Sequence, residues 1–247
     1  VAVAGAGGME GMYIGVEEGG LSFRGLEGDG GDLILLGGCG HRTGGNEGGR
    51  YARLAAKAER FWPGCVERAR WSAQDCMSLD GVPYIGRFSQ GQPSWYVATG
   101  FGKWGMSHSM VSALLIRDLI LEQENTWEQV FSPSRFASQD VGGLVKNAGC
   151  SVKGLVGKAR REREIHPEEL MAGEGKILRY GDGPVGVCRD EEGKLHLVSA
   201  RCPHMGCELV WNPDEMSWDC PCHGSRFGYD GRVLDGPAQI GIGLEWR

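Results

Sequence analysis

Short apolar runs alternate with glycine-rich turns over the first fifty residues. Between residues 19 and 49, the run Leu33 to Leu36 forms an apolar strand core between glycine clusters. This pattern predicts β-hairpins rather than disorder. The opening VAVAGAGG, followed by the alternating GMYIGVEE, predicts two strands joined by a glycine turn. It does not fit a dinucleotide fingerprint, because Glu10 stands where the third glycine would follow Gly5 and Gly7.

A strand, a glycine turn and a helix are predicted in succession over residues 95–121. The strand is WYVA, the turn is TGFGKWG, and the helix is MSHSMVSALLIRDLIL, with Met106, Met110 and Leu114 at helical spacing. Free backbone N–H groups and the helix dipole at such a junction favour an anion. The alternative interpretation is an ordinary strand–helix connection.

The chain from about residue 165 is predicted to be all-β. Three segments with Asp/Gly turns between them indicate antiparallel strands: PEELMAGEGKILRY, PVGVCRD and KLHLVSARC. Another hairpin is predicted at 228–231, before Val233. We therefore expect an α+β chain with domains at 1–140 and 165–247. The linker, 141–164, is predicted to be partly helical over 152–163, and the mixed charges at 160–164 indicate a solvated face.

Composition excludes several classes of protein. The chain has 247 residues, 41% of them hydrophobic, and a net charge of −6. The acidity and the lack of a basic patch argue against nucleic-acid binding. No apolar run approaches the roughly twenty residues of a transmembrane segment. Because the chain begins at Val1 without a charged n-region, no signal peptide is expected. We expect a cytoplasmic protein, since the cysteines outside the last fifth are scattered, as reduced thiols are.

Two cysteine- and histidine-containing boxes lie in the last fifth of the chain, CPHMGC at 202–207 and CPCHGS at 220–225. They provide Cys202-x-His204 and Cys220-x-x-His223. Two cysteines on one iron and two histidines on the other define a Rieske [2Fe–2S] centre. Two thiolates neutralise the +2 core, so adding an electron costs less than at a four-thiolate site. The boxes therefore predict single-electron transfer.

Other residues near the boxes complete this interpretation. Cys207 and Cys222 are left over, one per box, and their positions suit a disulfide between the two loops. Ser225 can donate a hydrogen bond to a cluster sulfide, which favours the reduced state. Gly236-Pro237 has the composition of the loop that covers the cluster in this family. Phe227 stands where high-potential respiratory Rieske proteins carry a tyrosine, so we expect a potential below the top of the Rieske range.

Two other metal sites fit less well. A structural zinc site could use the same four ligands, but zinc ligands usually pair across two to four residues, and zinc does not explain the second cysteine of each box. A Rieske oxygenase would need a separate 2-His-1-carboxylate site for mononuclear iron, and no such set is evident.

The first half resembles a known flavoenzyme family. RWSAQDCMSLDGVPYIG at 70–86 and YVATGFGKWGMSHSM at 96–110 resemble the C-terminal half of FAD-dependent oxidoreductases of the D-amino-acid-oxidase/glycine-oxidase superfamily. In particular, the chain resembles the subgroup in which that domain is fused to a C-terminal Rieske domain. GMYIG at 11–15, GGCGHRTG at 38–45 and FSPSRF at 131–136 add support. The N-terminal Rossmann part of such a domain is absent, so the chain resembles a fragment.

The resemblance implies FAD as a second cofactor. Its expected contacts are the residues of the glycine turn and the helix start: Gly100, Gly102, Lys103, Trp104, Gly105 and Met106. Amino-acid oxidases of the superfamily bind the substrate carboxylate with an arginine five residues before the aspartate of DGxPxIG. Asp75 stands there, which favours a cationic or neutral amine, although Asp75 also suits a solvated surface acid. His41 and His108 lie near the inferred flavin edge, but a histidine without a partner is more often structural.

The predicted function is electron transfer through the Rieske cluster, coupled in the intact protein to FAD-dependent oxidation of an amine-like substrate. The expected partner is a redox protein or a small-molecule electron donor or acceptor. The alternative is a stand-alone Rieske electron carrier whose first half is a non-catalytic docking domain. Such a protein would bind no flavin.

Overall fold

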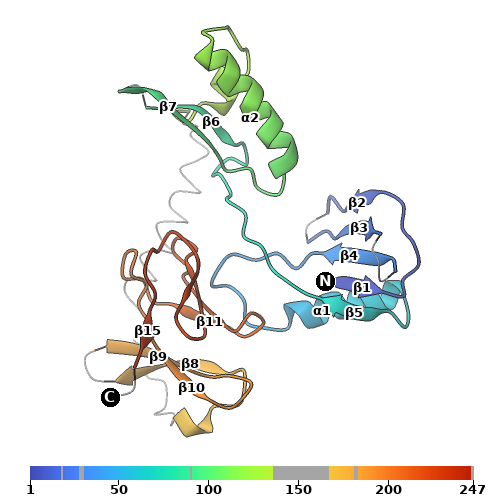
Figure 1. Cartoon of the computed structure of the whole chain (residues 1–247), viewed down its shortest axis with the longest axis vertical. Helices are drawn as coiled ribbons and strands as arrows, with labels where there is room; N and C mark the ends of the chain where they lie inside the picture. Colours follow the sequence, from blue (N-terminus) through green and yellow to red (C-terminus); the bar gives the residue numbers. More distant parts are fainter. Residues whose placement is uncertain (18, 28–30, 90, 136–166, 181–182, 246–247) are drawn as a thin grey trace. The chain divides into compact units, whose positions relative to one another are not determined.

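The computed structural model describes residues 1–17, 19–27, 31–89, 91–135, 167–180 and 183–245. It has two compact units, one formed by Val1–Ser72 with Cys150–Arg247 and the other by Ala73–Gly149. Figure 1 traces the elements of each unit. The predicted α+β class is confirmed by a mixed N-terminal part and a β-rich C-terminal part. The predicted linker and its helical stretch lie outside the described residues.

The first unit begins with a five-stranded antiparallel sheet in the order β2-β3-β4-β1-β5. Its strands are β1 (Ala2–Ala4), β2 (Met12–Ile14), β3 (Ser22–Leu26), β4 (Leu33–Gly37) and β5 (Val66–Ala69). Helix α1 (Arg50–Phe61) packs against the sheet through Tyr51, Leu54 and Ala58, which join Ile34 and Leu36 in one buried cluster. This apolar contact stabilises both layers.

The predicted hairpin around Leu33 is confirmed, since β3 pairs with β4 from Ser22↔Gly37 to Leu26↔Leu33. The two strands predicted at the N-terminus are present as β1 and β2, with a glycine-rich segment between them. β1 and β2 do not pair, because β3 and β4 lie between them in the sheet. β1 instead pairs with β4 and β5, which come later in the chain.

The second unit consists of a hairpin covered by a helix. β6 (Tyr84–Ser89) and β7 (Gln92–Thr99) pair antiparallel, and α2 (Gly105–Ile120) packs along them, as Figure 1 shows. The short helix α3 (Glu128–Phe131) contacts β6. The predicted strand, turn and helix over 95–121 are therefore confirmed. Leu115 and Leu119 form the buried face of α2 with Ile85, whereas Met106 and Met110 of the predicted apolar stripe are exposed.

The C-terminal part of the chain, residues 167–180 and 183–245, carries both boxes and is called the Rieske region after the predicted centre. It contains two four-stranded sheets. The first has the order β15-β10-β9-β8 and the second β11-β12-β13-β14. Their strands are β8 (Gly175–Tyr180), β9 (Gly183–Arg189), β10 (Leu195–Ser199), β11 (Val210–Asn212), β12 (Ser217–Asp219), β13 (Arg226–Gly228), β14 (Val233–Asp235) and β15 (Gly243–Leu244). One expected strand is shorter than predicted, because Pro167–Glu169 form a 3₁₀ turn before β8.

A single apolar core joins the two sheets of the Rieske region. Trp218 and Phe227 are fully buried in it, and the four cysteines of the two boxes, Cys202, Cys207, Cys220 and Cys222, belong to it. Gly186 on β9 permits this packing, because a Cβ there would lie 2.9 Å from the Trp218 ring. The core holds β12 and β13 in place, and these two strands carry the second box between them.

Candidate metal centre

The two boxes form two loops with the same backbone pattern. In the first, which lies between β10 and β11, Cys202 N donates to Cys207 O and Gly206 N donates to Cys202 O, both at 2.8 Å. The second, between β12 and β13, repeats these bonds at the same spacing: Cys220 N to Ser225 O at 2.8 Å and Gly224 N to Cys220 O at 3.1 Å. Gly206 and Gly224 have φ of 76° and 87°, which L side chains rarely adopt.

The four predicted ligands gather where the loops face each other. Cys202 and Cys220 are buried and have free thiols, each 2% exposed or less. His204 and His223 are exposed, and their ring centroids lie 4.8 Å apart with the rings almost perpendicular. The site thus has a buried sulfur side and an exposed imidazole side. This division fits a cluster whose irons take two cysteines and two histidines.

The two thiols lie close enough to affect each other. Burial raises the pKa of Cys220, the backbone N–H groups of His223 and Cys222 lower it, and the neighbouring Cys202 raises it further. The net effect favours the protonated thiol. A bound cationic metal would reverse this preference, since thiolates are the ligand form and metal binding releases their protons.

Cys207 and Cys222 form a disulfide between the two loops, with 6.7 Å between their Cα atoms. The sulfurs of Cys207, Cys220 and Cys222 lie within 4.8 Å of one another, which is itself a possible metal-binding group. Only Cys220 of these three has a free thiol, so this trio cannot supply three thiolates while the disulfide is present. The disulfide instead ties the loops that carry the predicted ligands.

Ser225 is the last residue of the second box, and Phe227 lies on β13 directly after it. The Ser225 side chain is fully buried, and its Oγ accepts a hydrogen bond from Ala238 N at 3.0 Å. Ala238 follows the Gly236–Pro237 peptide bond, which is cis. Phe227 is fully buried in the core and has no hydroxyl to donate.

A buried polar network next to Cys220 was not predicted from the sequence. Asp219 accepts hydrogen bonds from Asn212 Nδ2 and Ser217 Oγ, both at 2.8 Å, and from Arg226 Nε at 3.1 Å. Asp219 is only 2% exposed. A buried carboxylate needs such partners, and together they fix the backbone immediately before the second box.

The expected flavin contacts form one turn of the second unit. Gly100 and Gly102 have φ of 76° and 55°, and Gly102 N donates to Cys76 O at 3.1 Å. Helix α2 begins at Gly105, and the preceding Trp104 provides no side-chain cap. Lys103, Trp104 and Met106 are exposed. The turn therefore presents helix N-terminal N–H groups without a side-chain cap, as an anion site requires.

The three remaining candidate residues, His108, Asp75 and His41, have different surroundings. His108 is a structural residue, because its Nδ1 lies 3.1 Å from Phe101 O and its ring packs against the Phe101 ring. Asp75 is exposed. His41 lies in the other unit, where burial and Arg50 lower its pKa and Asp219 acts in the opposite direction.

Arg135 is a structural anchor that sequence reasoning missed. Its guanidinium donates to both carboxylate oxygens of Asp80, at 2.7 and 2.9 Å, and to the carbonyl of Pro83 at 2.8 Å. It also lies 4.1 Å above the centre of the Tyr84 ring. Arg135 thus fixes the start of the DGVPYIG motif. Arg135 and Asp80 are 55 residues apart in the sequence, so no local pattern pointed to this pair.

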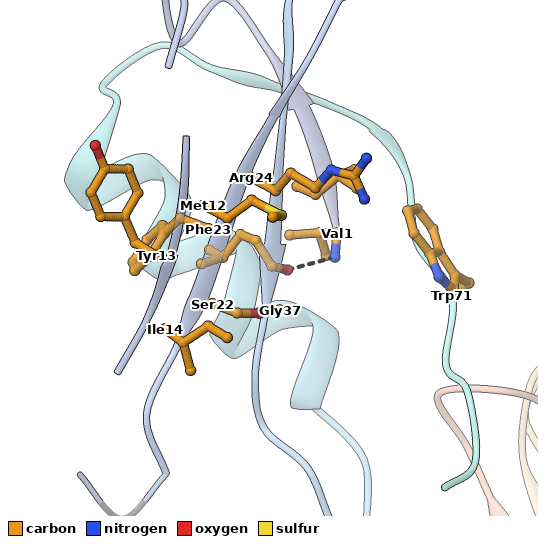
Figure 2. Close-up of a pocket in the computed structure, with 11 residues that line it drawn as sticks. Val1, Met12, Tyr13, Ile14, Ser22, Phe23, Arg24, Gly37 and Trp71 are labelled. Carbon is orange, nitrogen blue, oxygen red and sulfur yellow. Dashed lines mark hydrogen bonds between the residues drawn. The ribbon is translucent and has the colours of Figure 1, made fainter. Parts of the chain in front are cut away.

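A pocket of about 340 Å³ opens on the five-stranded sheet. Figure 2 shows side chains of β2 and β3 at the pocket, including Met12 and Phe23, with Val1 and Trp71 nearby. The amino group of Val1 donates to Leu36 O at 2.9 Å, and burial lowers its pKa. The lining is mainly apolar and includes none of the predicted site residues.

Comparisons with known proteins match both parts of the chain. Residues 162–242 match the Rieske [2Fe-2S] domain family, and residues 11–119 match the FAD dependent oxidoreductase family. The chain is 40% identical over 235 residues to a protein of Bacillus subtilis (strain 168) named "Putative Rieske 2Fe-2S iron-sulfur protein YhfW". That match covers 93% of this chain and 46% of the relative.

Other relatives match the Rieske region. The cytochrome b6-f complex iron-sulfur subunit 2 of Synechocystis sp. is 43% identical over 105 residues, which are 40% of this chain and 58% of that subunit. Among solved structures, the cyanobacterial plasma membrane Rieske protein PetC3 from Synechocystis PCC 6803 is 33% identical, with a TM-score of 0.27. That match covers 28% of this chain and 70% of PetC3. The chain spans about half the length of the curated relatives it matches. In the described ranges, no helix has the length and apolar character needed to cross a bilayer.

Proposed function

Because the chain combines a Rieske [2Fe–2S] domain with a region of the FAD dependent oxidoreductase family, we propose that it transfers electrons within a flavin-dependent oxidoreductase. The domain boundaries that we propose are 1–140 for the flavoenzyme part, 141–164 for the linker and 165–247 for the Rieske domain. The two family matches, at 11–119 and 162–242, support this division.

We assign the cluster to Cys202, His204, Cys220 and His223. The observation that carries the assignment is the pairing of two adjacent buried thiols with two exposed imidazoles on loops of identical backbone pattern. When bound, the cluster accepts or releases one electron at a time. Two cysteine thiolates balance the charge of its oxidised core, which keeps the cost of an added electron low.

The surrounding side chains set the properties of the site. The exposed rings of His204 and His223 place the imidazole side of the site where a redox partner can reach it. Ser225 supplies a hydroxyl beside the buried sulfur side, which stabilises the more negative, reduced state. Phe227 provides no second hydroxyl, so the potential should lie below the top of the range of about −150 to +300 mV.

The proposed FAD contacts are Gly100 and Gly102 of the turn and Lys103 to Met106 at the start of α2. FAD, when bound, accepts two electrons from a substrate. Uncapped N–H groups at the start of α2 would stabilise negative charge on the reduced flavin. We propose an amine-like substrate without a required carboxylate, because Asp75 is an exposed acid at the position of the family's carboxylate-binding arginine.

We propose that electrons pass between this protein and a redox protein or a small-molecule donor or acceptor in the cytoplasm. A second candidate function is a stand-alone Rieske carrier with a non-catalytic first half. Trp104 and Met106 of the turn are exposed, as they would be in a chain that binds no flavin.

The first experiment is a visible and EPR spectrum of the purified chain before and after dithionite, with iron, zinc and flavin analysis. A red-brown protein whose reduced signal has an average g below the free-electron value would support the cluster. A colourless protein with one bound zinc would contradict it.

The flavin part is tested by adding FAD to the same preparation. Binding that is weakened in a Lys103→Gln variant, but not in a control variant Lys57→Gln on α1, would support the assigned contacts. Iron without any flavin binding would favour the stand-alone carrier.

A further inference from the structure

The segment between β4 and the first turn of α1, residues 39–51, contacts the cluster-binding half of the Rieske region. We call it the 39–51 segment. Asn46 is 4% exposed, and its Nδ2 donates to Asn212 Oδ1 at 2.8 Å and to Asp214 Oδ2 at 3.2 Å. A buried amide is costly unless its hydrogen bonds are satisfied. The partners that satisfy Asn46 are more than 160 residues away in the sequence.

Asp214 also caps helix α1 from the Rieske side. Its Oδ1 accepts from Gly49 N at 2.9 Å, and its Oδ2 accepts from Arg50 N at 2.8 Å. The helix has no cap of its own, because Gly49 has no side chain and the first turn contains no acidic residue. A carboxylate at this place satisfies free N–H groups and complements the helix dipole.

The backbone of the 39–51 segment approaches that of the second box closely. A Cβ on Gly44 would lie 2.8 Å from Pro221 Cβ, and Pro221 stands between Cys220 and Cys222. Gly44 also has a φ of 76°, so only glycine suits this contact. Farther along, Ser72 Oγ donates to Glu215 Oε1 at 2.9 Å, and the Tyr51 hydroxyl bonds the same carboxylate.

The contact continues inward as a chain of hydrogen bonds. Asn46 bonds Asn212, Asn212 Nδ2 donates to Asp219 Oδ2 at 2.8 Å, and Asp219 precedes Cys220. Asn212 is 3% exposed and Asp219 is 2% exposed. Fully satisfied buried networks of this kind hold one arrangement and disfavour others.

We propose that the 39–51 segment is a docking site for the Rieske domain of the same chain, which fixes the second cluster loop against the five-stranded sheet. Asn46 and Asp214 are the positioning residues. In this arrangement the Rieske domain keeps one position relative to the five-stranded sheet and does not move between redox partners. This inference goes beyond the proposed electron transfer, and the contact itself can be tested without any redox activity.

The first test is hydrogen exchange on the full, cluster-loaded chain. In an Asp214→Ala variant, the amides of Gly49 and Arg50 should exchange about 5- to 30-fold faster, the factor expected for losing a helix cap of about 1 to 2 kcal/mol. A Glu47→Ala variant is the matched control, because Glu47 is exposed beside Asn46. Unchanged exchange at these two amides in Asp214→Ala would overturn the proposal. If Asp214→Ala does not fold, Asp214→Asn, which keeps one acceptor oxygen, should show a smaller increase.

The second test uses the cluster as a paramagnetic probe in NMR. The amide signals of Gly44 and Gly45 should be broadened in the native protein and should sharpen in an Asn46→Ala/Asp214→Ala variant whose EPR signal is unchanged. Sharp signals in the native protein, or undiminished broadening in the double variant, would contradict docking through these residues. Absence of the EPR signal would instead count against the cluster assignment, so the two failures are distinguishable.

Discussion

The backbone N–H of Ala238 donates to the hydroxyl oxygen of Ser225 at 3.0 Å, and both residues are buried. Because the N–H takes a lone pair of the oxygen, the hydroxyl hydrogen stays available for another acceptor. We expect this hydroxyl to donate to a sulfide of the bound cluster, because Ser225 ends the loop that carries Cys220 and His223.

Replacing Ser225 with alanine should lower the midpoint potential of the cluster. The hydroxyl favours the more negative state, and a hydrogen bond worth about 1.4 kcal/mol more to the reduced than to the oxidised cluster corresponds to about 59 mV. A redox titration followed by EPR measures the shift. Ser134→Ala, an exposed position in the other unit, is the control. A potential that does not fall in Ser225→Ala would exclude a hydrogen bond to the cluster.

Removing the disulfide should weaken the cluster site without removing a ligand. Cys207 and Cys222 are separated by 15 residues, and closing a loop of that length stabilises a fold by about 3 kcal/mol. The Cys207→Ser/Cys222→Ser variant should lose its visible absorbance at a lower guanidinium concentration than the native protein. Cys76→Ser, which alters an exposed free thiol, should not. An unchanged midpoint in the double variant would show that the disulfide is dispensable.

The locally encoded parts of the fold could be predicted from the sequence. The hairpin of β3 and β4 and the succession of β7 and α2 depend on neighbouring apolar positions and glycine turns. The order of strands in the first sheet could not, because β1 pairs with β4 and β5 through contacts that no local pattern specifies. The buried face of α2 also depends on its neighbours, since Ile85 of β6 selects Leu115 and Leu119 over Met106 and Met110.

The candidate site also combines features that a local motif predicts with features that depend on long-range contacts. The ligand boxes are short motifs, so their residues could be named from spacing alone. The bonds between Asn46 and Asn212 and between Asp214 and the start of α1 join positions more than 160 residues apart. A signal was present in the sequence, because the glycines before Arg50 leave α1 without a side-chain cap. Only the folded chain shows which carboxylate supplies it.

Acid should weaken the second unit in a way that depends on Arg135. The bond from Arg135 lowers the pKa of Asp80 from 3.8 to about 2, with a smaller contribution from the Val82 N–H and with burial opposing both. Because the folded pKa lies below the unfolded one, this stabilisation is fully present above about pH 4 and is lost as the pH falls through 2. It corresponds to about 2 kcal/mol. The protection factors of the β6 and β7 amides, which are exchange rates corrected for the intrinsic rate at each pH, should therefore fall between pH 4 and 2, and less so in Asp80→Asn.

Replacing Arg135 itself should destabilise the second unit at neutral pH. The side chains of Arg135 and Asp80 are only 15% and 14% exposed, so truncating one leaves the other charge buried without its partner, at a cost of about 3 kcal/mol. The carbonyls of Pro83 and Phe131 lose a donor as well. Lys103→Ala is the control, because Lys103 is an exposed cation of the same unit, and replacing an exposed side chain usually changes stability by at most about 0.5 kcal/mol. Exchange of the β6 and β7 amides measures both variants. If they destabilise the unit equally, burial of the Asp80 pair does not set its strength, and Arg135 is not the anchor of the DGVPYIG motif.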